Sequence, residues 1–147
     1  MKRVTLVLLL IFVPVTTPSH AQQQRRSTTE SRLVEDFSFT MKDFKMDHQS
    51  QMNNLKITVR YRYRANITKA DYPDFRWLEK DIETNLTNYP NENDYWEILN
   101  KDLTAMLMKK YPSLTRLTIE IEVPPSSLVP FQRSSIVTRD RSDKRRL

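Results

Sequence analysis

The stretch NDYWEILNKDLTAML, residues 93–107, predicts an amphipathic helix with an acid, Glu97, in its first turn. Its apolar side chains recur at steps of three and four residues, the spacing that places them on one face of a helix. We expect this helix to run from about Asp94 to Tyr111, where Pro112 ends it. The apolar face consists of Trp96, Leu99, Leu103, Met106 and Leu107.

A second helical pattern precedes the first, at residues 71–89. Asp71 or Asp74 can cap its start, and Pro73 is tolerated in a first turn. Residues 90–93, Pro-Asn-Glu-Asn, separate the two helices. The apolar stripe of this helix consists of Phe75, Leu78, Ile82, Leu86 and Tyr89.

Strand patterns flank the helix pair on both sides. The clearest is LKITVRYRYR, residues 55–64, in which apolar and aromatic side chains alternate with cations and threonine. The polar residues 48–54 include Asn53-Asn54, where we expect the turn between the first two strands. The four predicted strands are 37–41, 55–64, 117–123 and 131–138.

This order of elements predicts one α+β domain over residues 36–138. Each strand has one apolar and one polar side, as in an antiparallel sheet with one solvated face. The two striped helices need an apolar layer to cover. We therefore expect a four-stranded antiparallel sheet with two helices on one face.

The beginning of the chain has the features of an export signal. Met1-Lys2-Arg3 is a short positive start, residues 4–15 (VTLVLLLIFVPV) are apolar, and Ser19-His20-Ala21 fits the small-x-small cleavage pattern. The apolar stretch is shorter than the roughly 20 residues that a membrane-spanning helix needs. We expect a signal peptide at 1–21, no membrane span, and a polar, disordered leader at 22–35.

The chain contains no cysteine and no glycine. An exported domain without disulfides must be held by packing or by association. Because small secreted animal domains usually depend on disulfides, we favour a bacterial envelope origin, periplasmic or secreted. Thiol catalysis and cysteine-based zinc sites are excluded, and so are glycine-rich nucleotide-binding loops.

Histidine is almost as scarce, with only two in the sequence. His20 leaves with the signal peptide, which excludes a three-histidine zinc site within one mature chain. His48 lies in the polar stretch before the second strand, and we interpret it as a solvated loop residue. We expect no metal and no cofactor.

Cations line the polar side of the strand at 55–64, in a chain with a formal net charge of +6. A basic face of this kind can bind nucleic acid. Glu120 and Glu122, however, lie on the polar side of another predicted strand, so cross-strand ion pairs or the lining of a tunnel explain the cations better. We expect no nucleic-acid partner. The four cations are Lys56, Arg60, Arg62 and Arg64.

Glu97 has two possible roles. An acid in the first turn stabilises a helix through its dipole. Alternatively, the carboxylate lies at the edge of a pocket and accepts two N–H donors from a flat heterocycle. Tyr72, ahead of the first helix, and Trp77, off its apolar stripe, could stack on a ligand or on a neighbouring subunit.

Two short motifs connect these residues to a known family. Asp71-Tyr72-Pro73-Asp74-Phe75 resembles the Asp/Asn-Tyr-x-x-apolar opening of the first helix in dihydroneopterin aldolases. Trp96-Glu97-Ile98-Leu99 resembles the Leu-Glu-x-Leu opening of their second helix. With the order of elements, residues 55–138 thus resemble the tunnelling fold, which also includes pyruvoyl-tetrahydropterin synthase, GTP cyclohydrolase I and urate oxidase.

The resemblance implies an oligomer. Subunits of this family join edge to edge into barrels, and the bare face of the sheet lines a tunnel. It implies that Glu97 anchors a pterin or purine ring and that Tyr72 lies beside the pocket. The residues it places in the tunnel are Arg60, Arg62, Glu120 and Glu122.

The chain departs from the aldolase branch at a catalytic position. Aldolases carry Lys-Pro after the third strand, where this chain has Glu122-Val123-Pro124. The zinc ligands of the synthase and cyclohydrolase branches are missing too, and export is foreign to cytosolic pterin metabolism. We therefore expect a divergent, exported and non-catalytic homo-oligomer that binds a small heterocycle or serves as an assembly module.

Two other functions stay open at this stage. One is an enzyme that acts on a pterin- or purine-like substrate, with Glu97 as the anchor. The other is a binder of anionic envelope surfaces through the C-terminal residues 139–147, which we expect to be a basic, disordered tail.

Overall fold

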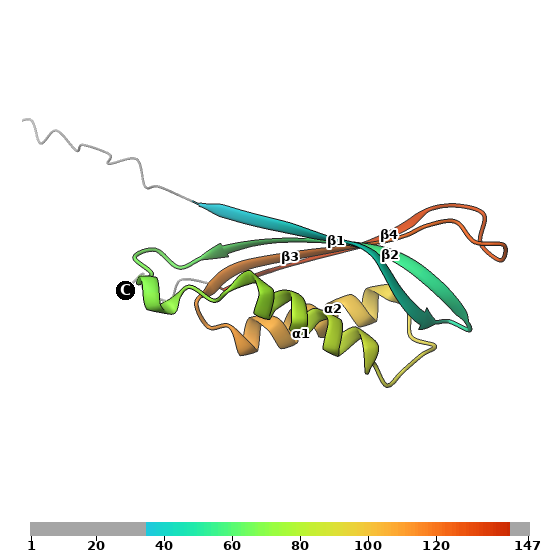
Figure 1. Ribbon diagram of the computed structural model, residues 1–147, viewed down its shortest axis with the longest axis horizontal. Coiled ribbons are helices and arrows are strands. Elements are labelled where there is room, and N and C mark those ends of the chain that lie inside the picture. The colour runs from blue at the N-terminus through green and yellow to red at the C-terminus, as the bar shows by residue number, and fades with distance from the viewer. Residues whose placement is uncertain (1–34, 142–147) are drawn as a thin grey trace, which may run out of the picture. The chain divides into compact units, whose positions relative to one another are not determined.

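The chain folds in the order strand, strand, helix, helix, strand, strand in the computed structural model, which describes residues 35–141 (Figure 1). A short 3₁₀ turn, η1, precedes the first helix. The elements are β1 (Asp36–His48), β2 (Gln51–Tyr63), η1 (Lys69–Asp71), α1 (Phe75–Thr87), α2 (Trp96–Lys110), β3 (Leu114–Val123) and β4 (Arg133–Asp140). The predicted signal peptide, residues 1–21, and residues 22–34 of the predicted leader lie outside the described residues.

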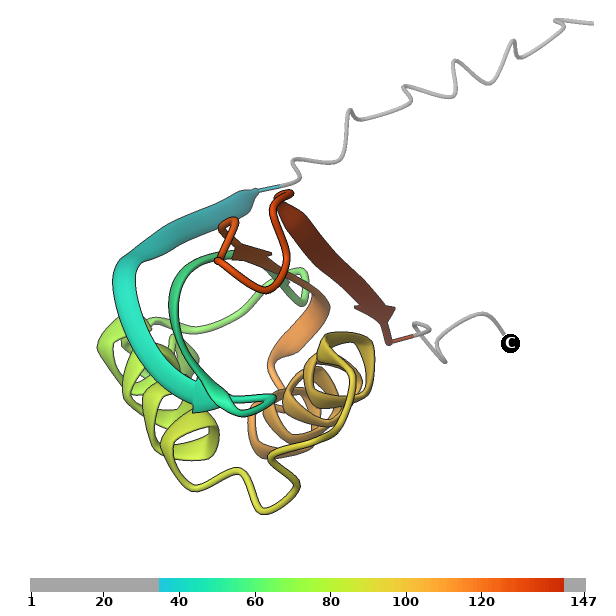
Figure 2. The same ribbon diagram turned by 90° about the vertical axis from the view of Figure 1, so that its right-hand side faces the viewer.

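The four strands form one sheet in the order β1-β2-β3-β4, and each neighbouring pair is antiparallel. Figure 1 shows both helices on the same side of this sheet, and Figure 2 shows the sheet curving around them. This arrangement confirms the predicted α+β class, with a four-stranded antiparallel sheet and two helices on one face.

Alternation along the central strands builds the core between the sheet and the helices. In β2, Leu55, Ile57 and Val59 are fully buried, and the residues between them face away from the helices. Removing this apolar layer from water is the main force that holds the helices on the sheet. The helices contribute Leu78, Ile82 and Leu86 from α1, and Trp96, Leu99, Leu103 and Leu107 from α2.

The opposite face of the sheet carries ion pairs that cross from strand to strand. Lys56 pairs with Glu122 at 2.5 Å, and Arg60 pairs with Glu120 at 3.3 Å, both across the boundary between β2 and β3. Arg62 instead turns towards β1. These contacts confirm the predicted cross-strand pairing of the basic strand with the acids of β3.

The turn between β1 and β2 lies at Gln49-Ser50, so its predicted place at Asn53-Asn54 is wrong. His48 pairs with Gln51 across the turn, and the two turn residues have positive φ angles of 53° and 61°. Asn53 lies within β2, and its side-chain amide donates hydrogen bonds to the carbonyls of His48 and Gln51, at 2.9 and 2.8 Å. Its polar side chain therefore braces the hairpin from inside the strand.

Helix α1 begins directly after Asp74, whose carboxylate accepts a hydrogen bond of 2.9 Å from the backbone N–H of Arg76. Of the two predicted caps, Asp74 is the one used. Phe75, predicted for the core, is 54% exposed, because the first residue of α1 stands beside the edge strand β1, where its ring lies near Phe39. Trp77 is exposed, as its position off the stripe predicted.

Strand β4 lies two residues further along the chain than the predicted strand at 131–138. The first two residues of the predicted tail, Arg139 and Asp140, therefore belong to the sheet. Arg116 on β3 fixes this end of the strand, because its guanidinium donates a hydrogen bond of 2.6 Å to Asp140. Residues 142–147 of the predicted tail lie outside the described residues.

Candidate functional site

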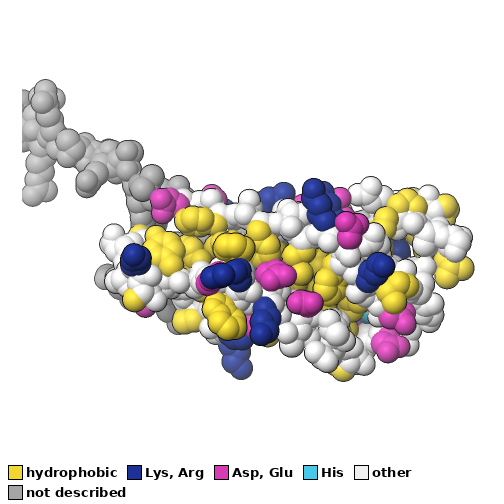
Figure 3. Space-filling view, in the orientation of Figure 1, with side chains coloured by type: hydrophobic (Ala, Val, Ile, Leu, Met, Phe, Trp, Pro, Cys, Tyr) yellow, Lys and Arg dark blue, Asp and Glu magenta, His cyan; other side chains and the backbone are white. Residues whose placement is uncertain are grey.

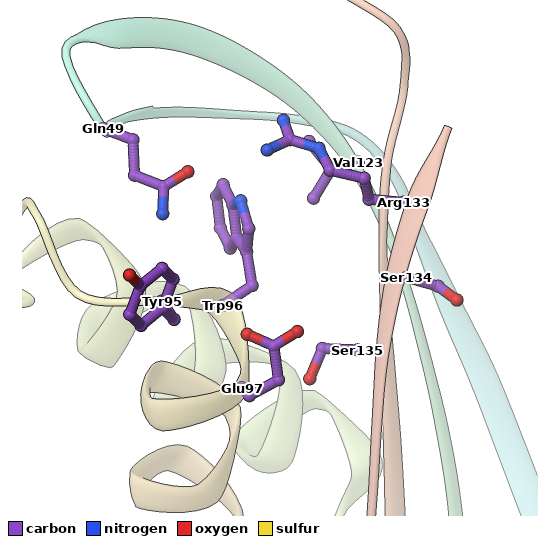
Figure 4. Close-up of a pocket in the computed structure, with 8 residues that line it drawn as sticks. All are labelled: Gln49, Tyr95, Trp96, Glu97, Val123, Arg133, Ser134 and Ser135. Carbon is purple, nitrogen blue, oxygen red and sulfur yellow. The ribbon is translucent and has the colours of Figure 1, made fainter. Parts of the chain in front are cut away.

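A pocket of about 460 Å³ opens at the N-terminal end of α2 (Figure 4). Four parts of the chain line it. The β1–β2 turn contributes Gln49, and the start of α2 contributes residues 95–97. The end of β3 contributes Val123, and the start of β4 contributes residues 133–135. The volume lies within the range of small-molecule sites in proteins.

Glu97 projects into this pocket from the first turn of α2 (Figure 4). Within the described residues its carboxylate has no hydrogen bond and no ion pair, although cations are abundant in the chain. The negative charge of Glu97 stabilises the start of α2 through the helix dipole, so the residue also has a structural role. The free carboxylate oxygens are nevertheless available to a ligand with N–H donors.

Trp96 lines the pocket beside Glu97, and the ring of His48 packs against Trp96. Trp96 is 5% exposed and His48 is 1% exposed, and their ring centroids lie 4.5 Å apart. The prediction that His48 is a solvated loop residue is therefore wrong. The ring is buried because β1 continues to His48 and passes under the start of α2, a register that the polar sequence around it does not reveal.

One carbonyl group fixes the His48 ring and the hairpin turn together. The carbonyl of Asp94 accepts hydrogen bonds from His48 Nε2 at 2.9 Å and from the side-chain amide of Gln49 at 3.0 Å. The backbone N–H of Gln49 donates to the carbonyl of Glu92 at 2.8 Å. The β1–β2 turn is thus tied to the loop between the helices, and this tie shapes one wall of the pocket.

The same loop is held from the other side by Tyr89. Its hydroxyl donates a hydrogen bond of 2.8 Å to the carboxylate of Asp94. Burial raises the pKa of Tyr89 well above its usual range, and the neighbouring Asp94 carboxylate raises it further. The hydroxyl therefore stays protonated and keeps its role as a donor.

A buried polar cluster that the sequence did not predict joins α2 to the sheet behind the pocket. The Asn100 side-chain amide donates to the carbonyls of Ile119 and Ser135, both at 3.0 Å, and to the Ser135 hydroxyl at 3.2 Å. Thr104 donates to the carbonyl of Asn100 at 2.7 Å. Asn100 and Thr104 occupy helical positions next to the apolar stripe, which is the only sequence signal that could have marked them.

Arg133 is a lining residue that the sequence analysis did not single out. Its Nε and Nη2 atoms are buried and have no hydrogen-bond partner among the residues that the structure describes. The Nε1 atom of Trp96 is buried and unpartnered in the same way. Both groups are donors only, so the pocket combines unsatisfied donors with the free acceptor at Glu97.

Tyr72, the other predicted ligand-binding residue, lies far from this pocket within one chain. Its ring packs against Tyr63, with centroids 4.9 Å apart, and Tyr63 pairs with Leu114 at the start of β3. The pocket lies at the opposite end of β3, beside Val123. Ten residues of strand separate the two ends by about 30 Å, and Figure 1 shows η1 at the end of the sheet away from the β1–β2 turn.

The four predicted tunnel residues, Arg60, Arg62, Glu120 and Glu122, do not line the pocket. They lie on the sheet face that the helices leave bare. No group of three or more potential metal-binding side chains occurs within residues 35–141. Over the same residues, none of the helices combines the length and apolar character that crossing a membrane requires.

Comparisons with known proteins give a likeness in structure but none in sequence. No family model matches the sequence. No curated protein matches it either. Among solved structures, a dihydroneopterin aldolase from Burkholderia thailendensis bound to guanine is 10% identical, with a TM-score of 0.55 over 73% of this chain and 93% of that one.

Two further structures resemble the chain. A putative dihydroneopterin aldolase from Vibrio cholerae is 11% identical, with a TM-score of 0.55 over 71% of this chain and 98% of that one. An archaeosine synthase QueF-Like in the apo form is 9% identical, with a TM-score of 0.48 over 74% and 95% of the two chains. The strand order, the paired helices and the two aldolase matches together show that this chain has the tunnelling fold.

Proposed function

We propose that the protein binds a small, flat heterocycle of the pterin or purine type at Glu97, without catalysing a reaction on it. The observation that carries the proposal is the free Glu97 carboxylate at the edge of a pocket of suitable size. An adjacent pair of ring N–H and amino donors fits the two oxygens of a carboxylate. The Burkholderia aldolase, which shares this fold, contains guanine in its structure.

A binding role is favoured over catalysis by the residue at the end of β3. Val123 precedes Pro124, where the aldolase motif carries its lysine, and an aliphatic side chain can neither donate nor accept a proton. The described part of the chain gathers no metal-binding cluster that could replace it. Incubation with dihydroneopterin should therefore give no turnover above the rate without protein.

The test of binding is calorimetry of the purified chain with pterin and with guanine. We expect at least one of them to bind with a dissociation constant in the micromolar range, and Glu97→Gln to weaken that binding at least tenfold. Glu83→Gln is the matched control, since Glu83 is an exposed acid on α1 outside the pocket. If neither compound binds, or if both variants behave like the wild type, the proposal is wrong.

We propose further that the pocket is completed by a second copy of the chain. Tyr72 lies at the far end of the sheet from Glu97, so both residues can serve one ligand only if neighbouring copies join. β1 and β4 are edge strands, each paired on one side only within residues 35–141. Figure 3 shows hydrophobic side chains gathered between β1 and α1, the surface that such a contact would cover.

The proposed location is outside the cytoplasm, with the bacterial envelope favoured. The charged start, the apolar stretch at 4–15 and the Ser19-His20-Ala21 site support it. N-terminal sequencing of the chain recovered from a bacterial periplasm should begin at Gln22. Recovery of a chain that still begins at Met1, from the cytoplasm alone, would refute export.

A further inference from the structure

Arg133 occupies a special place in the sheet, directly across from Val123. The pairing of β3 with β4 sets these two residues opposite each other at the rim of the pocket. The chain thus has an aliphatic side chain at the end of β3 and a cation on the neighbouring strand, one cross-strand step away. The aldolase motif carries a lysine after the third strand. Here the positive charge at the pocket comes instead from an arginine on the fourth strand.

The Arg133 guanidinium lacks the contacts that a structural arginine makes in this protein. Arg62 and Arg116 each donate to an aspartate, and Arg139 donates to a backbone carbonyl. The buried Nε and Nη2 atoms of Arg133 have no such acceptor within residues 35–141. Buried, unpaired donors on a charged group are unfavourable, so an acceptor from outside the chain would relieve them.

The donors of Arg133 and Trp96 face the same space. Figure 4 shows the guanidinium reaching from β4 towards the Trp96 indole, while the Glu97 carboxylate projects from the first turn of α2 towards β4. No ion pair joins Arg133 to Glu97 among the described residues, although both line the pocket. The site therefore offers an acceptor in one place and a cluster of donors in another.

We propose, building on the proposed function, that the ligand is an anionic heterocycle whose carboxylate or other oxyanion is bound by Arg133. The ring N–H groups meet Glu97, and the oxyanion accepts hydrogen bonds from the Arg133 guanidinium and the Trp96 indole. A guanidinium matches a carboxylate with two parallel hydrogen bonds. It also stays protonated at any physiological pH, so it binds the anion and cannot act as the acid or base of a reaction.

Pterin and pterin-6-carboxylate test this proposal, because they share the ring donors and differ by one carboxylate. Calorimetry on the purified full chain should show that pterin-6-carboxylate binds at least tenfold more tightly than pterin. Arg133→Gln should remove this preference. Arg133→Lys should keep part of the preference, since it retains the charge but loses the paired geometry.

Arg139→Gln is the matched control, because it removes the same charge from the same strand outside the pocket. Its preference for the carboxylate should equal that of the wild type, and the circular dichroism of all three variants should show a folded protein. If pterin binds in a Glu97-dependent way but the carboxylate brings no preference, or if Arg133→Gln keeps it, this inference is wrong and the proposed function stands. If neither of these pterins binds, this inference is wrong, and if guanine does not bind either, the proposed function fails with it.

Discussion

His48 packs against Trp96 with ring centroids 4.5 Å apart, and this contact joins the β1–β2 hairpin to the start of α2. The Asp94 carbonyl accepts a hydrogen bond from His48 Nε2, so Nε2 carries the proton in the neutral ring. The Nδ1 atom is then a bare acceptor, and it is buried without a partner in the described part of the chain. The ring therefore contributes through packing and through one hydrogen bond.

Two substitutions of His48 should separate the contribution of its ring packing from that of its hydrogen bond. His48→Ala removes a fully buried ring, and we expect it to lower the free energy of unfolding by about 3 kcal/mol. His48→Phe keeps most of the ring packing, loses one hydrogen bond and removes the unpaired Nδ1, so its cost should be about 1 kcal/mol. Urea denaturation of both variants measures this difference. Equal losses would show that packing on Trp96 contributes little.

Ser50→Gly should stabilise the protein. Both residues of the β1–β2 turn have positive φ, a region that is strained for any residue with a Cβ atom and in which hairpins favour glycine. We expect a gain of about 1 kcal/mol in the free energy of unfolding, measured in urea. Ser38→Gly is the control, because Ser38 lies in β1 and glycine weakens a strand. A loss of stability in both variants would contradict the strain argument.

The strand and helix order could be predicted from the sequence because side-chain periodicity records which face of each element is buried. Leu55, Ile57 and Val59 alternate, and Leu99, Leu103 and Leu107 recur at helical spacing, and the structure buries all six. The prediction of a turn at Asn53-Asn54 was wrong because asparagine is enriched in turns but also occurs within strands. Here the Asn53 amide bonds to backbone carbonyls from within the strand.

The pocket could be predicted only in part. Glu97 was found because a first-turn acid has a local sequence signature. Arg133 and Ser135 reach the pocket through the register of β4 against β3, a long-range pairing that no local pattern encodes. His48 was misjudged for the same reason, since its burial depends on where α2 crosses the hairpin.

Asn100→Leu should be more destabilising than the matching branched shape of the two side chains implies. The Asn100 amide serves the carbonyls of Ile119 and Ser135 in the interior, and leucine leaves these acceptors without that donor. We expect a loss of about 2 kcal/mol in the free energy of unfolding. Asn88→Leu is the control, because Asn88 is exposed at the end of α1 and should change stability by less than about 1 kcal/mol. Similar values for the two variants would mean that the buried amide is dispensable.

Stability should fall as the pH is lowered from about 5 to 2. Hydrogen bonds from Arg62 lower the pKa of Asp36, and hydrogen bonds from Arg116 lower the pKa of Asp140. A carboxyl group whose pKa is lower in the folded state stabilises the fold above its unfolded pKa, near 3.8, and this stabilisation is lost as the pH falls through the folded value.

The double variant Asp36→Asn with Asp140→Asn should therefore show a shallower decline of the urea midpoint over this pH range. Both carboxylates are exposed, so the difference should be small and should shrink in 1 M salt. Arg62→Met combined with Arg116→Met should flatten the profile in the same way, because it removes the other half of each pair. An unchanged slope in both double variants would show that these pairs do not affect acid stability.

The proposed sharing of the pocket between copies predicts complementation between two defective variants. Glu97→Gln removes the ring anchor and Tyr72→Ala removes the aromatic contact, so each alone should bind pterin at least tenfold more weakly. When the two are unfolded together and refolded as a mixture, some neighbouring copies supply Glu97 from one chain and Tyr72 from the other. Random mixing around a ring restores about a quarter of the sites.

Calorimetry of the mixture should therefore show pterin sites of wild-type affinity at about a quarter of the total, and light scattering should give a mass that is a multiple of one chain. The control mixture of Glu97→Gln with the double variant Glu97→Gln, Tyr72→Ala contains no intact Glu97 and should restore none. Because Tyr72 and Glu97 lie at opposite ends of β3, a single chain cannot bring them to one ligand. A monomeric mass, or a mixture as inactive as its components, would confine the site to one chain and remove Tyr72 from it.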